Sequence, residues 1–413
     1  MSSLLITEIK ALIGTHAADV KLLRGNSMSD LPILENSWLL IENGLIKDFG
    51  SMDSLSEFGP DIPTISAKGQ FVLPSWCDSH THLVFAASRE EEFVMTIQGQ
   101  SYEQIAASGG GILNSARKLA DTSEDELFEN AYQRLIDVIK MGTGAIEIKS
   151  GYGLTFESEL KMLRVIRRLK EEADIPVKST FLGAHTYPLK FKNDHEGYLS
   201  ILIDQLLPEI ADQGLADYID VFSEKGFFSV DETARIMEAG AKFGLKSKIH
   251  ANQLSASGAV EVGVKHGALS VDHLEMMDSA ALNSLINSST IATLLPSCSL
   301  FLGIPFADAR TLMNNDIPVA LATDYNPGST PSGNMNLVVS LACIRQKMLP
   351  EEAINAATIN GAAAMELSEN YGSISRGKVA NLFISKAMHS LAYLPYSFGS
   401  SPIDTVILKG KII

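Results

Sequence analysis

Two histidines separated by one residue, His80 and His82, are the first side chains in this sequence that could do chemistry together. They follow an apolar run, and in an extended chain residues i and i+2 point to the same side, so both imidazoles could meet one metal ion. Three further candidates end other apolar runs: His250, His273 and Asp324. Each alone is better explained as a hydrogen-bonded histidine or a turn aspartate. Together they favour a metal centre, because imidazoles and a carboxylate that converge on one place are hard to explain as packing.

The donor types of this group indicate the ion and the reaction. Imidazole nitrogen and carboxylate oxygen form a borderline donor set that suits Zn or Fe and not Ca or Mg. An ion held in this way lowers the pKa of its bound water toward neutrality and supplies hydroxide at pH 7. Asp324 could serve both as a ligand and as the base that passes the water proton onward. The sequence therefore predicts metal-assisted hydrolysis.

The elements that must position these residues follow from the hydrophobic pattern. From residue 69 to about residue 365, short apolar runs alternate with amphipathic segments, two of which begin with the capping boxes Ser123/Glu126 and Ser229/Glu232. Eight strands that alternate with helices favour a (β/α)8 barrel over a doubly wound sheet. The predicted strands are residues 71–78, 144–149, 177–184, 218–223, 245–251, 268–273, 290–296 and 317–323. Because barrel enzymes work at the carboxyl ends of their strands, this fold would bring the candidate residues to one mouth.

Both ends of the chain have the pattern of strands and turns. Residues 1–70 contain Asn43-Gly44 between two apolar runs, which is a strong hairpin signal. From about residue 370 onward the pattern returns to strands. We predict an α/β protein of two domains, with a composite β domain from residues 1–70 and 370–413 and the barrel from residues 71–369.

Composition limits the class of protein. Of the 413 residues, 33 are Lys or Arg and 49 are Asp or Glu, and the formal net charge of -16 argues against binding to nucleic acid or to an anionic membrane. Three cysteines lie far apart and form no C-x-x-C pair, so neither a disulfide framework nor a cysteine metal cage is expected. We also expect no secretory leader and no transmembrane span. These features predict a cytoplasmic protein whose partner is a small-molecule substrate.

The H-x-H motif after the first barrel strand, with His, His and Asp at the ends of the fifth, sixth and eighth, resembles the amidohydrolase superfamily, in which both chain ends usually form a β-sandwich. Five segments are similar to the imidazolonepropionase family within it: SREEEF (88–93), GGGI (109–112), EIKSGYGL (147–154), TFLGAH (180–185) and ATDYNPGS (322–329). That family opens 4-imidazolone-5-propanoate to N-formimidoyl-L-glutamate in histidine degradation. The resemblance implies a hydrolase of a cyclic amide C–N bond, a small β-sandwich beside the barrel, and a homodimer, which is a habit of the superfamily.

The resemblance also implies roles for individual residues. It places one Zn2+ or Fe ion per subunit on His80, His82, His250 and Asp324. Asp324 would act as general base and then acid, and His273 as a donor to the developing oxyanion rather than as a permanent ligand. The planar guanidinium of Arg89 suits the propanoate carboxylate. The other implied substrate contacts are Tyr152, His185, Gln253, Asn326, Gly328 and Ser329, with Gln253 also a catalytic candidate.

Several alternatives stay open at this point. Arg89 could be a surface arginine that pairs with one of the glutamates at positions 90–92. Residues 109–111 could be an active-site loop or a plain linker. Gln253 stands where many family members carry glutamate and cannot shuttle a proton, and Ser75 replaces a usual glycine, for which we have no functional account. Another cyclic amidohydrolase, a nucleobase deaminase on the same fold and a catalytically dead scaffold barrel are rival functions, although a deaminase has no use for an arginine aimed at a propanoate.

Overall fold

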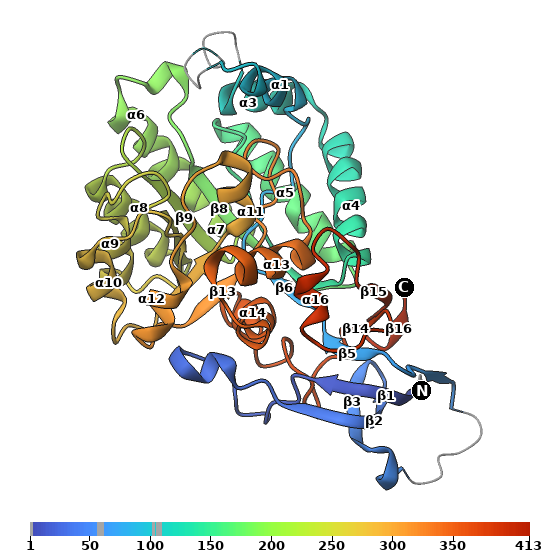
Figure 1. Cartoon of the computed structure of the whole chain (residues 1–413). Coiled ribbons are helices and arrows are strands. Elements are labelled where there is room, and N and C mark those ends of the chain that lie inside the picture. Colours follow the sequence, from blue (N-terminus) through green and yellow to red (C-terminus); the bar gives the residue numbers. More distant parts are fainter. Residues whose placement is uncertain (1–2, 56–61, 101–103, 105–109) are drawn as a thin grey trace.

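The structure, a computed structural model, describes residues 3–55, 62–100, 104 and 110–413 (Figure 1). Its larger part is a parallel barrel of eight strands in sequential order. They are β6 (Trp76–Asp78), β7 (Thr143–Lys149), β8 (Val177–Ala184), β9 (Tyr218–Ser223), β10 (Lys246–Ala251), β11 (Ser270–His273), β12 (Ile291–Leu294) and β13 (Val319–Leu321). A parallel bridge between Thr81 and Tyr325 joins the two ends of the sheet. The predicted (β/α)8 barrel is confirmed, and each of the eight predicted runs overlaps one barrel strand.

Helices follow the strands and cover the outside of the barrel (Figure 1). The predicted capping box at Ser229 and Glu232 is confirmed, whereas at the other predicted box Ser123 accepts a hydrogen bond from the Glu126 N–H without the reciprocal bond from the Glu126 side chain. The longer helices are α1 (Glu90–Ile97), α3 (Ile112–Asp121), α4 (Glu124–Lys140), α5 (Phe156–Glu172), α8 (Val230–Lys242), α13 (Met335–Gln346) and α14 (Pro350–Ala357). The shorter helices are α6 (His195–Ser200), α7 (Leu207–Asp212), α9 (Ala259–Lys265), α10 (Ser279–Leu285), α11 (Pro296–Leu302), α12 (Ala309–Asn314), α15 (Ile359–Ala363) and α16 (Tyr393–Tyr396).

The first predicted strand, residues 71–78, is divided between two sheets. Its first half is β5 (Phe71–Pro74), which belongs to the second sheet, and its second half is β6 in the barrel. Pro74 has no N–H to donate, so a continuous ladder ends there. The next two N–H groups turn to different partners: Ser75 donates to the Asn381 carbonyl and Trp76 to the Gly142 carbonyl. Ser75 thus marks the crossing between the two domains.

Both ends of the chain build the second sheet, as predicted. Its strands run in the order β16 (Lys411–Ile412), β15 (Ile403–Leu408), β14 (Leu382–Ser385), β5, β1 (Ser3–Ile13), β2 (Ile33–Glu42) and β3 (Leu45–Ser51), and β4 (Thr64–Ser66) also pairs with β1. The predicted hairpin connects β2 to β3, and Asn43 and Gly44 both have the positive φ that a tight turn between two strands requires. The first and last strands of the chain, β1 and β16, both lie in this second sheet, outside the barrel (Figure 1). Within the described residues, we find no helix with the length and apolar character needed to span a membrane.

Candidate metal centre and active site

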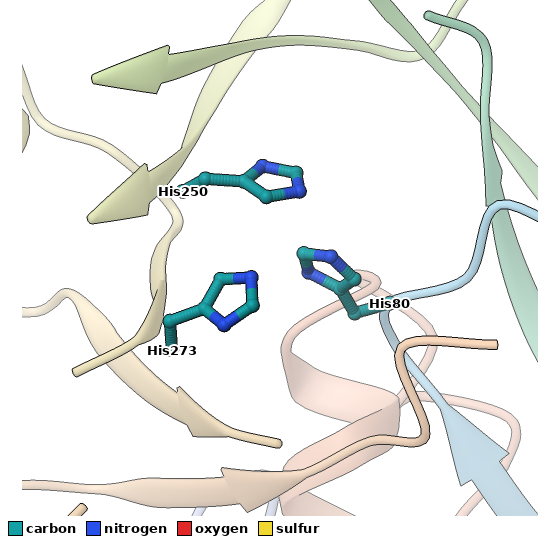
Figure 2. Close-up of side chains that lie close together, drawn as sticks. All are labelled: His80, His250 and His273. Atoms are coloured by element: carbon teal, nitrogen blue, oxygen red, sulfur yellow. The ribbon is translucent and has the colours of Figure 1, made fainter. Parts of the chain in front are cut away.

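The five side chains that the sequence marks for chemistry lie together at the carboxyl mouth of the barrel. His80 and His82 follow β6, His250 lies in β10, His273 ends β11 and Asp324 follows β13, and all five are buried. Asp324 Oδ1 lies 3.6 Å from His80 Nε2 and 3.4 Å from His82 Nε2. The Nε2 atoms of His82 and His250 are 3.4 Å apart. Figure 2 shows the rings of His80, His250 and His273 directed toward one shared space.

Two buried aspartates determine which nitrogen of His80 and His250 faces this space. His80 Nδ1 lies 2.6 Å from Asp272 Oδ2, and His250 Nδ1 lies 3.0 Å from Asp220 Oδ2. The Asp272 carboxylate accepts the Nδ1–H of His80 and leaves its Nε2 lone pair free, and the Asp220 carboxylate beside His250 Nδ1 favours the same tautomer there. Carboxylates in this position orient histidines that bind metals.

The cluster fits a metal ion. His80 Nε2 and His82 Nδ1 are buried and have no hydrogen-bond partner among the described residues. Burial lowers the pKa of His80 well below its usual value, and the charges of Lys149 and the neighbouring imidazoles act in the same direction. The ligand atoms of His80, His82 and Asp324 lie within 4.8 Å of one another, as do those of His80, His250 and His273. Buried imidazole nitrogens that face a carboxylate across a shared space are the donor set of a metal site.

His273 is in a different electrostatic state. Its Nδ1 lies 3.6 Å from Glu275 Oε1. Burial alone would lower the pKa of His273, but the carboxylates of Glu275, Asp324 and Asp272 together outweigh burial and raise it. A histidine that keeps its proton donates a hydrogen bond, which is the state that an oxyanion donor requires.

The backbone is strained at two of these positions. His273 has a φ of 88° and Asp324 a φ of 57°, in a region that residues other than glycine rarely adopt. Neighbouring strands hold both segments: Asp324 N–H donates to the His80 carbonyl at 3.0 Å, and Leu274 N–H to the Ala251 carbonyl at 3.1 Å. Strain of this kind concentrates at functional sites, where the surrounding fold maintains it.

A buried network of charged residues lies beneath the cluster, and the sequence analysis missed it. Lys149 Nζ lies 2.5 Å from Glu147 Oε1 and 2.9 Å from Asp220 Oδ2, and Lys248 pairs with the second oxygen of Glu147. Burial alone would lower the pKa of Lys149, but Asp220, Glu147 and Asp272 raise it, so the ammonium persists. The sequence does contain a signal for this network: four of the predicted strand runs carry charged residues among their apolar ones, in AIEIK, YIDVF, SKIHA and SVDH. Such a residue must be paired when the strand is buried on both faces.

Arg89, Tyr152 and His185 lie beside the cluster. The His185 ring stacks on that of His82 with centroids 5.3 Å apart, and the Tyr152 ring lies 5.4 Å from His185 and 5.9 Å from His82. The Arg89 guanidinium lies 5.7 Å from the centre of the Tyr152 ring. Arg89 Nε donates to Ser115 Oγ at 2.8 Å, whereas its Nη2 is buried without a partner among the described residues. Arg89 therefore faces the pocket and not the neighbouring glutamates, of which Glu90 pairs with Ser88.

The loop that carries Tyr152 is held by Glu159, which the sequence analysis did not select. The buried Glu159 carboxylate accepts hydrogen bonds from the N–H groups of Gly151, Gly153 and Leu154 at 3.1, 2.7 and 3.0 Å. At Gly153, a Cβ would lie 2.4 Å from the Glu159 nitrogen, so only glycine fits. The Glu159 carboxylate thus holds the loop in the conformation that places Tyr152 beside the histidine cluster.

The loop after β13 holds both Asp324 and Arg89 in place. Asn326 Oδ1 accepts from the N–H groups of Gly328 and Ser329, while its Nδ2 donates to the Asp324 carbonyl and to Ser329 Oγ. Ser329 Oγ lies 3.4 Å from Asp324 Oδ2. A Cβ at Gly328 would lie 2.4 Å from Arg89 Nη1, so the guanidinium rests on this glycine. Direct substrate contact by Asn326, Gly328 and Ser329 stays a prediction.

Gln253 has a partner that the sequence analysis did not foresee. Its Nε2 donates to the sulfur of Cys298 at 3.4 Å. Cys298 lies in α11 and is buried at the barrel mouth, where its sulfur is within 4.8 Å of ligand atoms of His273 and Asp324. No spacing pattern could have linked this single cysteine to the histidines. Gly109 lies outside the described residues, and Gly111 donates its N–H to Glu92 Oε1 at 2.9 Å.

A parallel barrel with imidazoles and a carboxylate clustered at its carboxyl mouth defines a class, the metal-binding barrel enzymes. The sequence profile of the Amidohydrolase family matches residues 71–413. The imidazolonepropionase of Christiangramia forsetii is 56% identical over 411 residues and covers 100% of both chains. That of Flavobacterium johnsoniae is 54% identical, with 99% of both chains covered, and that of Geobacillus thermodenitrificans is 40% identical, with 100% of this chain and 98% of its own covered. This chain therefore belongs to the amidohydrolase family and, within it, to the family of the imidazolonepropionases.

Solved structures support the fold at low sequence identity. The guanine deaminase of E. coli aligns with a TM-score of 0.74 at 13% identity and covers 100% of this chain and 99% of its own. An adenosine deaminase from Xanthomonas campestris with bound zinc aligns with a TM-score of 0.69 at 16% identity, covering 100% of this chain and 92% of its own. Because these identities are low, the likeness bears on the architecture and not on the substrate.

Proposed function

We propose that this chain hydrolyses the ring amide of 4-imidazolone-5-propanoate and releases N-formimidoyl-L-glutamate, the reaction of the histidine degradation step for which its relatives are named. The observation that carries the proposal is the position of Arg89. Its Nη2 is buried without a partner among the described residues, and the Tyr152 ring lies 5.7 Å from the guanidinium and 5.9 Å from the His82 ring. A small ring with a charged arm fits between such a cation and a hydrolytic centre.

The residues that would hold the metal are His80, His82, His250 and Asp324, as one Zn2+ or Fe ion per subunit. Nitrogen and oxygen donors accept either metal. When bound, the ion supplies a water of lowered pKa and polarises the ring carbonyl. Asp272 and Asp220 keep the Nε2 lone pairs of His80 and His250 directed at the ion through their contacts with Nδ1.

Asp324 moves the proton. Burial alone would raise the pKa of Asp324, but hydrogen bonding with His82 and the charges of His273 and His82 outweigh it and lower the pKa, so the carboxylate starts ionised. It accepts the proton of the attacking water as the C–O bond forms, and it returns that proton to the ring nitrogen as the C–N bond breaks. His273, with its raised pKa, donates a hydrogen bond to the oxygen on which negative charge develops.

The remaining pocket residues bind and orient the ring. Arg89 pairs with the propanoate carboxylate, and this remote contact aligns the ring carbonyl with the attacking water. Tyr152 and His185 form an aromatic wall against the ring. Gln253 donates a hydrogen bond from its Nε2 to the Cys298 sulfur, so its Oε1 is left to accept a hydrogen bond from an N–H of the substrate ring.

Product identification tests this function. The purified protein, loaded with Zn2+ or Fe, is incubated with 4-imidazolone-5-propanoate, and the product is identified by mass spectrometry. We expect N-formimidoyl-L-glutamate from the wild type and from the control His266→Ala, whose histidine lies away from the cluster, and none from His80→Ala. The rival deaminase function predicts ammonia release from guanine or adenosine with the imidazolone left intact, and that result would contradict the proposal.

We further propose that the protein works in the cytoplasm as a homodimer. The β domain predicted over residues 1–70 and 370–413 would also take in β5 (Phe71–Pro74), so the barrel domain would begin at Ser75 and run to residue 369. The charge of -16 supports a protein that stays away from nucleic acids and anionic membranes. Light scattering on the purified protein tests the dimer, and a single mass equal to one chain would contradict it.

A further inference from the structure

Cys298 is a buried nucleophilic side chain at the barrel mouth that the proposed reaction does not use. It lies in α11, which follows β12, and its side chain is fully buried. Ligand atoms of Cys298, His273 and Asp324 all lie within 4.8 Å of one another, so three elements bring a sulfur, a nitrogen and an oxygen to one point. The other two cysteines, Cys77 and Cys343, are not in this group.

This group has the chemistry of a site for a thiophilic divalent ion. Thiolate and imidazole donors select Zn2+ and related soft ions, and three protein ligands with one open position suffice for a tetrahedral ion. The ligand atoms of such an ion lie about 3 to 4 Å apart, so the present spacing requires only a small contraction around the ion. Asp324 has two carboxylate oxygens, and Oδ1 is the one directed at His80 and His82.

A second observation points to a cation at the same place. Glu275 is buried, and its Oε2 has no hydrogen-bond partner among the described residues, while its Oε1 accepts from Ser299 Oγ at 2.9 Å. The same Oε1 lies 3.6 Å from His273 Nδ1, the arrangement in which an outer carboxylate orients a metal-binding histidine. Asp324 and Glu275 therefore place two negative charges beside one sulfur in a dry pocket, which favours a divalent cation over any anion.

We propose that Cys298, His273 and Asp324 form a second cation subsite, which shares Asp324 with the metal centre and takes Zn2+ or Cd2+ in excess. Binding forms a bond between the ion and the Cys298 sulfur, and the thiol proton leaves to the solvent. Two ions that share a carboxylate in this way lie about 4 Å apart in two-metal enzymes. Occupancy of the subsite blocks the reaction, because it engages the His273 and Asp324 atoms that handle charge and proton. Only this inhibition depends on the proposed function; binding itself does not.

The test uses the holoenzyme with one equivalent of Zn2+ or Fe, titrated with Cd2+. After removal of free ions, elemental analysis should give about two metal equivalents per chain, and an ultraviolet charge-transfer band between thiolate and Cd2+ should grow with the second equivalent. Cys298→Ser should stay at one equivalent without the band, and its affinity for the second ion should fall at least about tenfold. The matched control Cys343→Ser, at a half-buried cysteine in α13, should behave as the wild type.

Each other outcome overturns the subsite. If the charge-transfer band persists in Cys298→Ser, another sulfur binds the Cd2+. If Cd2+ replaces the first ion and the number of metal equivalents per chain stays at one, the protein has one site and not two. Should Cys298→Ser fail to fold, anomalous diffraction from Cd2+-soaked wild-type crystals decides directly, because the second peak must lie within bonding distance of the Cys298 sulfur. In the wild type the second equivalent should also abolish hydrolysis of 4-imidazolone-5-propanoate. If the metal counts agree but hydrolysis is absent from the start, the proposed function fails and the subsite stands.

Discussion

Replacing Arg89 by methionine tests how the pocket recognises its substrate. Arg89 Nε is held by Ser115 Oγ at 2.8 Å, Nη1 rests on Gly328, and Nη2 is buried without a partner among the described residues, so the Nη end is the part that can receive a carboxylate. A charge-assisted hydrogen bond to a carboxylate contributes about 1.5–3 kcal/mol. The loss of one such contact corresponds to about a 10- to 150-fold weaker affinity.

The assay compares KM and kcat for 4-imidazolone-5-propanoate and for a ring analogue that lacks the carboxylate. Arg89→Met should raise KM for 4-imidazolone-5-propanoate by about 10- to 150-fold. It should leave the metal content unchanged and barely alter the slow hydrolysis of the analogue. Arg345→Met, at an arginine that stacks on Phe306 at the surface, is the matched control and should behave as the wild type. If Arg89→Met loses equally on both substrates, the arginine is structural and the reasoning is wrong.

Gly328→Ala provides an independent perturbation of the same contact. A Cβ there would lie 2.4 Å from Arg89 Nη1 and must displace the guanidinium. We expect KM to rise in Gly328→Ala, but to rise little further when the change is made in the Arg89→Met background, because both substitutions remove one interaction. Fully additive effects in this double-mutant cycle would refute the contact.

Four further predictions follow from the site and its supports. Asp272→Asn removes the charge beside His80 Nδ1 and should weaken metal affinity about 10- to 100-fold in a chelator competition; an unchanged affinity would contradict the orienting role. Asp324→Asn keeps a ligand oxygen but cannot accept a proton, so turnover of the metal-loaded variant should fall by roughly 10² or more, and retained turnover would assign the proton to another group. Glu159→Gln should lower the free energy of unfolding by about 1–3 kcal/mol in chemical denaturation, because it weakens the bonds to three loop N–H groups; wild-type stability would show that these bonds contribute little. Burial lowers the pKa of Lys378 from 10.5 to about 8, so the folded protein binds this proton less tightly than the unfolded chain does. Protonation of Lys378 therefore favours the unfolded state as the pH falls through this range. Thermal stability should therefore rise relative to Lys378→Met as the pH increases from about 8 toward 10.5, and parallel profiles would contradict this assignment.

The barrel was predictable because its signal is local. Each strand run is a short apolar segment with an amphipathic helix after it. The capping residues Ser123 and Ser229 mark helix starts, and each is recognised from a segment of only four residues. The division of residues 71–78 was not predictable from apolar character, since both halves are buried strands. It depends on which distant segments, Asn381 or Gly142, receive the successive N–H groups.

The histidine and aspartate cluster was predictable for a similar reason: strand ends in a barrel converge, so residue type and position suffice. Its supports were not, because they depend on contacts between residues far apart in the chain. Asp272 is 192 positions from His80, and Cys298 is 45 positions from Gln253. The left-handed backbone at His273 has no sequence signal either, since histidine does not favour that conformation.

Metal reconstitution tests the central claim most directly, that one ion held by His80, His82, His250 and Asp324 enables ring hydrolysis. The metal-free protein is titrated with Zn2+ or Fe, and the loss of imidazolone absorbance is measured at each addition. We predict no hydrolysis without metal, a linear rise that reaches its maximum at one equivalent per chain, and no rise at all in His80→Ala. Full hydrolysis by the metal-free protein, or an equal response to metal in His80→Ala, would contradict the account.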